Sequence, residues 1–394
     1  MTSSSLLITP HSTLHFKALP PLSLYIHVPW CVRKCPYCDF NSHEARGELP
    51  EDQYVAALLA DLEAVLPQIW GRPVLTVFIG GGTPSLLSVR ALDALLSGVR
   101  ARLPLAADAE ITLEANPGTV EAEKFAGFRA AGINRVSLGI QSFNDAHLKA
   151  LGRIHDAAEA HRAAELALKV FDNVNLDLMY ALPRQTPEQA AADIAAAVAL
   201  APQHLSAYHL TIEPNTLFHH QPPVVPDDDT AAEMQDAVEA QLAAAGYQHY
   251  ETSAFARPGR QCRHNLNYWG FGDYIGIGAG AHEKLSFKNN VLRRSRLRQP
   301  KAYLAAAGSA VMFGEQRELT PAELPGEFMM NALRLNEGFD LELYRARTGC
   351  DITPLLPQLD AAEARGLLTR DHRRASPTPL GRRFLNDLIG LFLD

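Results

Sequence analysis

The chain has 394 residues, of which 47% are hydrophobic and 20% charged, a composition typical of a globular protein with a large core. Its formal net charge of −8 argues against a general nucleic-acid binder, because such proteins are usually basic. No stretch approaches the roughly 20 apolar residues that a membrane helix needs, so we expect no membrane span. Residues 1–21 lack the basic flank and apolar core of a secretion signal, which predicts a loose N-terminal tail and a cytoplasmic protein.

Short apolar runs alternate with alanine- and leucine-rich helical stretches between Leu24 and Pro214. Such alternation predicts right-handed βαβ units around a parallel sheet. Six units fit either an open doubly wound sheet or a partial barrel. The apolar runs are Leu24–Val28, Leu75–Ile79, Ile111–Leu113, Arg135–Ile140, Val174–Met179 and Leu205–Leu210.

Polar and glycine residues gather where these apolar runs end. In parallel α/β folds, that edge of the sheet carries the chemistry. A single such group would fit an ordinary turn, whereas several in succession indicate a shared site. The groups are Cys31–Cys38, Gly80–Pro84, Glu114–Pro117, Gln141 and Asp177–Tyr180.

Three of the five cysteines, Cys31, Cys35 and Cys38, lie within a stretch of eight residues. Thiolates are the normal ligands of iron–sulfur clusters, and three of them leave one iron of a four-iron cluster open to a chelating ligand. Zinc is the alternative, although a structural zinc site would need a fourth ligand such as His27 or His43.

Beyond residue 250 the alternation of strands and helices becomes less regular. Residues 251–310 are expected to form a connecting segment, in which the arginines from Arg293 to Arg298 would lie on a solvated strand face. Cys262 and Cys350 have no partner at ligand spacing and are expected to be buried, unreactive thiols. Residues 311–394 are expected to form a small helical domain, for which a winged helix is one candidate; the negative net charge disfavours a nucleic-acid role for it.

The loop Cys31-Val-Arg-Lys-Cys35-Pro-Tyr-Cys38, directly after the first predicted strand, resembles the signature of the radical SAM superfamily. The resemblance implies a partial (β/α)6 TIM-type barrel over residues 22–250, with a [4Fe–4S] cluster at its C-terminal mouth. It also implies S-adenosylmethionine on the open iron and an electron donor that reduces the cluster. Further segments resemble the coproporphyrinogen dehydrogenase-like branch: Gly80–Ser85, Leu113–Pro117, Leu138–Phe143, Leu151–Arg153 and Asn175–Pro183.

The resemblance to this branch also assigns roles to single residues. Tyr25 is expected to lie against the cofactor, Tyr37 to contact adenine, and Glu114 to meet polar atoms of the first S-adenosylmethionine. Three small residues are expected to hold its methionine end: Gly81, Gly82 and Thr83. Three others match positions that hold a second S-adenosylmethionine in the porphyrinogen enzymes: Gln141, Arg153 and Asp177. Each alone would fit a turn, a cap or a surface charge, and only together do they indicate a site.

One departure from the dehydrogenases separates this chain from them. Those enzymes carry a fourth cysteine two residues after the third, where this chain has Phe40. In this respect the chain resembles the heme chaperones of the same branch, and its string His264-Asn-Leu-Asn-Tyr-Trp269 matches their HNxxYW motif. That resemblance implies that His264 contacts heme, whereas an isolated string of this kind would suggest a structural histidine in an aromatic cluster.

The function implied by this resemblance is heme binding and delivery to heme-accepting proteins, such as respiratory heme proteins. The implied cofactors are the [4Fe–4S] cluster, S-adenosylmethionine and heme. Coproporphyrinogen dehydrogenase activity is then expected to be absent. The alternative is an enzyme that decarboxylates coproporphyrinogen III without oxygen, and Phe40 together with the HNxxYW string favours the chaperone.

Overall fold

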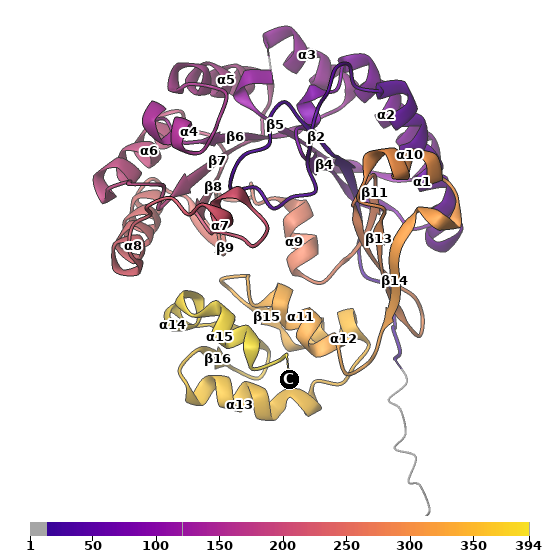
Figure 1. The fold of residues 1–394 in the computed structure, drawn as a ribbon. Helices are drawn as coiled ribbons and strands as arrows, with labels where there is room; N and C mark the ends of the chain where they lie inside the picture. Colours follow the sequence, from indigo (N-terminus) through magenta and orange to yellow (C-terminus); the bar gives the residue numbers. More distant parts are fainter. Residues whose placement is uncertain (1–13, 120, 394) are drawn as a thin grey trace, which may run out of the picture.

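The computed structural model describes residues 14–119 and 121–393 (Figure 1). Residues 1–13 of the expected loose tail lie outside this range. The rest of that tail packs against the protein: Leu14 and Phe16 are buried in the core of the C-terminal region. The backbone N–H of Phe16 donates to the carbonyl of Lys288 at 3.3 Å. These two apolar side chains find a complementary surface that the sequence alone does not reveal.

Six parallel strands form the centre of the fold, and they pair in the order in which they occur along the chain. Helices cover the outer face of this curved sheet (Figure 1). The predicted partial (β/α)6 barrel is therefore confirmed. Its strands are β1 (Leu22–Val28), β4 (Val74–Gly81), β5 (Leu105–Ala115), β6 (Arg135–Gln141), β7 (Val174–Tyr180) and β8 (His204–His209). Its main helices are α1 (Glu51–Ile69), α2 (Val89–Arg102), α3 (Ala122–Ala131), α5 (Ala157–Val170), α6 (Pro187–Ala199) and α8 (Asp228–Ala244).

The barrel helices begin where local chemistry favours helix initiation. Asp156 and Glu159 form a reciprocal capping box at the start of α5, and Thr186 and Gln189 form another at the start of α6. The helix α3 ends at Gly132, whose φ of 109° is in the left-handed region that glycine adopts readily. Capping residues of this kind fix where α5 and α6 begin and where α3 ends.

The sheet continues on both sides of the six parallel strands. On one side β11 (Asp273–Ile277) pairs in parallel with β1 and is followed by antiparallel strands. Residues 251–310, expected to form a connecting segment, thus supply strands of the main sheet, which runs on to Leu319. The additional strands are β9 (Gln248–Glu251), β10 (Ala254–Ala256), β12 (His282–Ser286), β13 (Val291–Arg296) and β14 (Phe313–Leu319), while α9 (Arg263–Trp269) and α10 (Pro300–Ala306) lie between them in sequence.

The prediction that the arginines of β13 lie on a solvated face is wrong for two of them. Arg294 and Arg296 are buried, because carboxylates distant in sequence neutralise them. Arg296 Nη2 lies 2.9 Å from Asp61 Oδ1 and 3.3 Å from Glu283 Oε2. Asp61 also accepts hydrogen bonds from the Tyr303 hydroxyl at 2.8 Å and from the backbone at Gly278. This ion cluster joins α1 to the added strands.

The C-terminal region combines helices with a small antiparallel sheet in the order β15–β17–β16, the mixture of elements that a winged helix has. Its core is built around Phe328, which contacts Phe339 and Tyr344. It is tied to the barrel where the backbone N–H of Thr252 donates to the Arg334 carbonyl at 3.1 Å. Its elements are α11 (Leu324–Ala332), β15 (Phe339–Asp340), α12 (Leu341–Thr348), α13 (Leu356–Ala364), β16 (Leu368–Arg370), β17 (Arg374–Pro377), α14 (Pro379–Arg383) and α15 (Leu385–Gly390).

None of the helices in the described residues is long and apolar enough to cross a membrane.

The buried ion cluster gives a first prediction. Arg296→Ala should lower the free energy of unfolding by about 3–5 kcal/mol, because Asp61 would be left buried without its cation and Glu283 would lose one of two. Arg317, on the neighbouring strand β14, pairs with Glu323 and more loosely with Glu327, and because it is exposed, Arg317→Ala should cost only about 0–1 kcal/mol. Urea unfolding of both variants checks the difference, and equal losses would contradict it.

Candidate active site and cofactor cavities

The cysteine loop follows β1 and is fixed to the end of β4 by backbone hydrogen bonds. The N–H of Gly82 donates to the Val28 carbonyl at 2.8 Å, and that of Thr83 donates to the Trp30 carbonyl at 2.7 Å. A side chain at position 82 would not fit, because its Cβ would lie 2.5 Å from the Trp30 oxygen and 3.0 Å from Cys31 Sγ. Glycine here lets the two loops approach each other closely.

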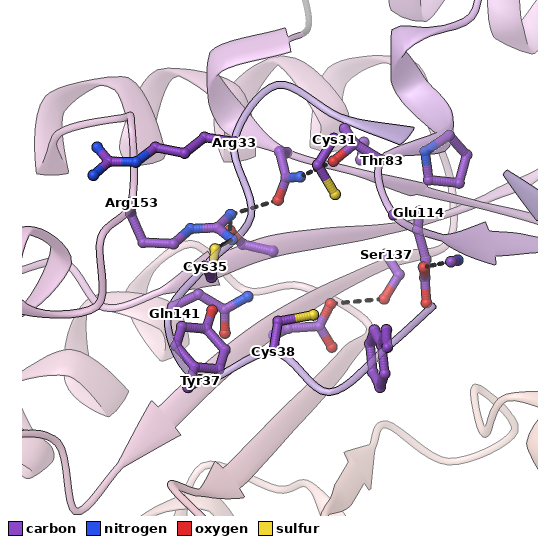
Figure 2. Close-up of a pocket in the computed structure, with 18 of the residues that line it drawn as sticks. Cys31, Arg33, Cys35, Tyr37, Cys38, Thr83, Glu114, Ser137, Gln141 and Arg153 are labelled. Atoms are coloured by element: carbon purple, nitrogen blue, oxygen red, sulfur yellow. Dashed lines mark hydrogen bonds between the residues drawn. The ribbon is translucent and has the colours of Figure 1, made fainter. Parts of the chain in front are cut away.

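Eleven of the predicted site residues line one cavity of about 300 Å³ at the carboxyl ends of the parallel strands. Figure 2 shows the sulfur atoms of the three cysteines facing this space. The eleven residues are Cys31, Cys35, Cys38, Tyr37, Gly81, Gly82, Thr83, Glu114, Gln141, Arg153 and Asp177. The two others, Tyr25 and His264, line a second cavity.

The three thiols have polar neighbours that suit bound thiolates. Arg153 Nη1 donates to Cys35 Sγ at 3.5 Å, and the Ser42 hydroxyl lies 3.8 Å from Cys38 Sγ. Burial raises the pKa of Cys31 and Cys38, while hydroxyl groups beside each act in the opposite direction. Binding of metal by these thiols therefore has to release protons. Among the described residues, no three His, Cys, Asp or Glu side chains converge as they would around a single metal ion.

Arg153 connects the cysteine loop to the neighbouring strand ends. One of its nitrogens, Nη2, donates to the Asn116 side chain and, at 2.9 Å, to the Gly139 carbonyl. Asn116 in turn donates to the Thr83 hydroxyl at 2.9 Å. A single chain of hydrogen bonds thus runs from Cys35 through Arg153 and Asn116 to Thr83 along the cavity wall, as Figure 2 shows in part. This chain of hydrogen bonds braces the cavity wall and leaves a positive charge beside the Cys35 thiol.

Two half-buried carboxyl groups, Glu114 and Asp177, line the same cavity. Burial and the nearby charge of Asp177 raise the pKa of Glu114 to about 8, although Gly81 donates its N–H to Glu114 Oε2 at 3.0 Å. Burial also raises the pKa of Asp177, against the opposing effect of hydrogen bonds from side chains such as Ser137 and Asn175. Such acids favour a cationic ligand, because a nearby positive charge stabilises their ionised form.

Gln141 reaches the cavity from a strained backbone. Its φ of 68° is in the left-handed region, and the pairing of β6 with β7 shifts register between Gly139 and Gln141. Bulges and strained residues of this kind redirect a side chain and are common beside active sites. Here the bulge turns Gln141 into the cavity at the end of its strand (Figure 2).

A second cavity, of about 650 Å³, adjoins the first. Phe40, Gly81 and Glu114 line both cavities and therefore form the wall between them. Gly81 has a φ of 120°, and a Cβ there would lie 2.6 Å from the His27 ring, so only glycine allows this thin wall. The lining of the second cavity is rich in aromatic rings and includes Tyr25, His27, Phe78, His264, Tyr268, Trp269 and Arg298.

His264 lies near the start of α9, where the Glu110 carboxylate accepts hydrogen bonds from the backbone N–H groups of Arg263 and His264. Its ring nitrogen Nδ1 lies 2.8 Å from the Thr76 hydroxyl, which itself donates to the Ser23 hydroxyl at 2.8 Å. Burial, and then the charge of Arg135, lower the pKa of His264 to about 3. The imidazole is therefore neutral at physiological pH.

Several residues of the two cavities are not among the predicted site residues. Ser137 and Tyr208 line the first cavity, and Phe78 lines the second, whereas Asn116 lies within the predicted group Glu114–Pro117. The side chains of a strand alternate between its two faces, so the polar residues at positions 135, 137 and 141 of β6 could have identified Ser137. Cys262 is buried, as expected, with its Sγ 3.6 Å from Glu110 Oε1.

Comparison with known proteins agrees with this geometry. The family model of the radical SAM superfamily matches residues 25–197, and that of the HemN C-terminal domain matches residues 319–384. The heme chaperone HemW of Escherichia coli (strain K12) is 54% identical over 377 residues, which cover 95% of this chain and 99% of that protein. The chain belongs to the HemW family. A HemW from Haemophilus influenzae is 47% identical over 381 residues, covering 95% of this chain and 98% of that protein.

The HemW family shares its fold with a solved radical SAM enzyme. The coproporphyrinogen III oxidase HemN from Escherichia coli matches this structure with a TM-score of 0.81 and 25% sequence identity, covering 95% of this chain and 90% of that one. Membership of the radical SAM superfamily implies a [4Fe–4S] cluster and S-adenosylmethionine as cofactors. The three thiols and the polar cavity beside them have the donor groups and the space that these cofactors need.

The raised pKa of Glu114 predicts a pH-dependent stability. Between pH 5 and 8 the folded protein keeps a proton on Glu114 that the unfolded chain releases, so the free energy of unfolding falls as pH rises. In the cofactor-free protein, this group should account for a loss of about 3 kcal/mol over that range, which Glu114→Gln should remove. Urea unfolding at several pH values measures it. Glu342→Gln, at an exposed helix position, serves as the control and should retain the wild-type slope.

Proposed function

We propose that this protein is a cytoplasmic heme chaperone, which binds heme and transfers it to acceptor proteins such as respiratory heme proteins. The observation that carries this proposal is the large aromatic cavity containing His264, directly beside the cysteine-lined cavity. The HemW relatives are named as heme chaperones, which supports the same conclusion. Phe40 stands where the dehydrogenases have a fourth cysteine, which favours a chaperone over coproporphyrinogen III decarboxylation.

Cys31, Cys35 and Cys38 are the proposed ligands of a [4Fe–4S] cluster, and the polar cavity beside them is the proposed site of S-adenosylmethionine. When bound and reduced, the cluster supplies one electron for cleavage of the sulfonium. The protein would contribute the positive charge of Arg153 beside Cys35 and the two carboxyl groups, Glu114 and Asp177, that face a cationic ligand. The remaining proposed contacts in that cavity are Tyr37, Gly81, Gly82, Thr83 and Gln141. Tyr25, which the family resemblance assigns to the same cofactor, lines the adjoining aromatic cavity.

The hydrogen bonds of His264 favour its role as an iron ligand. The Thr76 hydroxyl uses its own hydrogen to donate to Ser23, so it accepts from His264 Nδ1–H. This arrangement leaves His264 Nε2 with a free lone pair, because the one side-chain hydrogen bond of His264 to a described residue is made by Nδ1. A neutral imidazole held by its other nitrogen is the form that binds metals.

The rest of the second cavity suits a porphyrin. Tyr268 and Trp269 supply aromatic surface for a flat, largely apolar ligand, and the volume of about 650 Å³ is within the range of cofactor sites. Arg298 is exposed at the cavity and can meet a propionate. We therefore propose that heme enters this cavity with its iron at His264 and a propionate near Arg298.

The cluster assignment gives a prediction for the cysteines. Replacing Cys31, Cys35 or Cys38 with alanine should prevent retention of a four-iron cluster, because too few thiolates remain to hold it. Iron and sulfide analysis after anaerobic reconstitution measures the loss. Cys350→Ala removes a thiol outside both cavities and should keep a full complement of iron. Full iron content in any of the three loop variants would refute the assignment.

The heme assignment gives a prediction for His264. His264→Ala should weaken hemin binding by at least about tenfold and shift the Soret band, because one axial bond is lost. His282→Ala, at an exposed histidine of the same cavity, is the matched control and should bind hemin as the wild type does. Iron and sulfide content should stay unchanged in both variants. Unchanged hemin affinity and spectrum in His264→Ala would mean that this histidine has only a structural role.

A further inference from the structure

The cysteine loop separates the cysteine-lined first cavity, here called the cofactor cavity, from a groove on the outer side of the loop. The groove, of about 360 Å³, is lined by Cys35 and Cys38, which also line the cofactor cavity. The loop is therefore the wall between the two spaces, and two of the proposed cluster ligands can be approached from outside. The other residues that line the groove include Lys34, Pro36, Lys149, Asn215 and Leu217, together with Arg33, which also lines the cofactor cavity.

The groove is held open by two contacts with Pro36. The short helix α7 (Leu217–His220) forms one side, and the N–H of Phe218 donates to the Pro36 carbonyl at 2.9 Å. The end of α4 (Asp145–Ala150) forms the other side. It is followed by Gly152, with a φ of 68°, where a Cβ would lie 2.8 Å from Pro36 Cδ. The outer side of the loop is thus a defined surface rather than a mobile one.

The charge of this groove is opposite to that of the whole chain. Arg33, Lys34 and Lys149 line it, and no carboxylate does, whereas the chain has a formal net charge of −8. None of these three cations forms an ion pair with a described residue. Leu217, 54% exposed, adds apolar surface to the same groove. Exposed apolar residues next to unpaired cations are typical of a protein-docking surface with an anionic partner.

We propose that this groove is the docking surface for an acidic one-electron carrier protein that reduces the cluster. The proposal rests on the proposed function, in that it requires a cluster on Cys35 and Cys38. The carrier loses one electron and the cluster gains it, and no bond is formed or broken. The inner side of the loop faces the proposed S-adenosylmethionine site, so the groove offers a carrier access to the cluster without displacing that cofactor.

The test uses the double variant R33E/K149E. Lys34 is left unchanged because its Nζ donates to the carbonyls of Phe40 and Ser42 and so helps to fold the loop. The full chain is reconstituted with its cluster, and the rate of cluster reduction by photoreduced flavodoxin, a small acidic flavoprotein, is measured by optical bleaching. We expect the second-order rate constant to fall by at least about tenfold at low salt, and the difference from wild type to shrink as salt is added. The dissociation constant for oxidised flavodoxin should rise in parallel.

Three controls separate this proposal from the proposed function. Iron analysis comes first: a wild-type chain that cannot hold four irons would refute the cluster assignment rather than the groove. If R33E/K149E loses iron that the wild type keeps, K149E, whose residue lines only the groove, replaces it in the test. Photoreduced deazariboflavin, a small neutral reductant, should reduce variant and wild type at the same rate. K301E/R373E reverses two exposed charges outside the groove and should leave reduction by flavodoxin unchanged.

Several results would overturn the proposal. An unchanged rate and affinity for flavodoxin in R33E/K149E would show that the groove is not the docking surface, as would a fall that salt does not diminish. An equal fall with deazariboflavin would mean that the charges act on the cluster itself. Weaker binding of heparin without any change for flavodoxin would assign the groove to a different polyanion.

Discussion

The architecture of the site depends on the continuation of strand pairing past the end of the sheet. β1 and β4 pair in parallel, and the hydrogen bonds from Gly82 to Val28 and from Thr83 to Trp30 extend that pairing into the two loops that follow. These backbone bonds fix the start of the cysteine loop at the strand ends, and the Lys34 side chain then helps to fold the rest of it. Parallel strands deliver all their loops to one edge, so the polar ends of β5, β6 and β7 meet the same loop.

Burial determines the charge state of the groups around this loop. Glu114 and Asp177 hold protons more tightly than exposed acids do, and His264 holds one less tightly than an exposed histidine. In each case the low-dielectric interior disfavours the charged form. The cofactor cavity is thus prepared for a cation, and the aromatic cavity presents a neutral imidazole. The two cavities share a wall but suit different ligands, because different side chains and hydrogen bonds surround each of them.

The sequence predicted the six parallel strands because each is buried and appears as a short apolar run between helices. The cysteine spacing likewise predicted three thiols at one strand end. It could not predict that Arg294 and Arg296 of β13 are buried, since part of the negative charge that neutralises Arg296 comes from Asp61, 235 residues away. Nor could it predict two cavities in place of one, because the division depends on how closely the His27 ring packs against Gly81 in the folded protein.

The wall between the two cavities has a thermodynamic consequence. Glu114 borders both spaces, so its protonation equilibrium is common to them. A ligand in one cavity that changes the proton occupancy of this carboxyl group changes the affinity of the other cavity for its own ligand. By linkage the effect is reciprocal: the factor by which the first ligand alters the second equals the factor by which the second alters the first. Ligands bound on opposite sides of this wall would therefore be coupled through a single shared proton at Glu114.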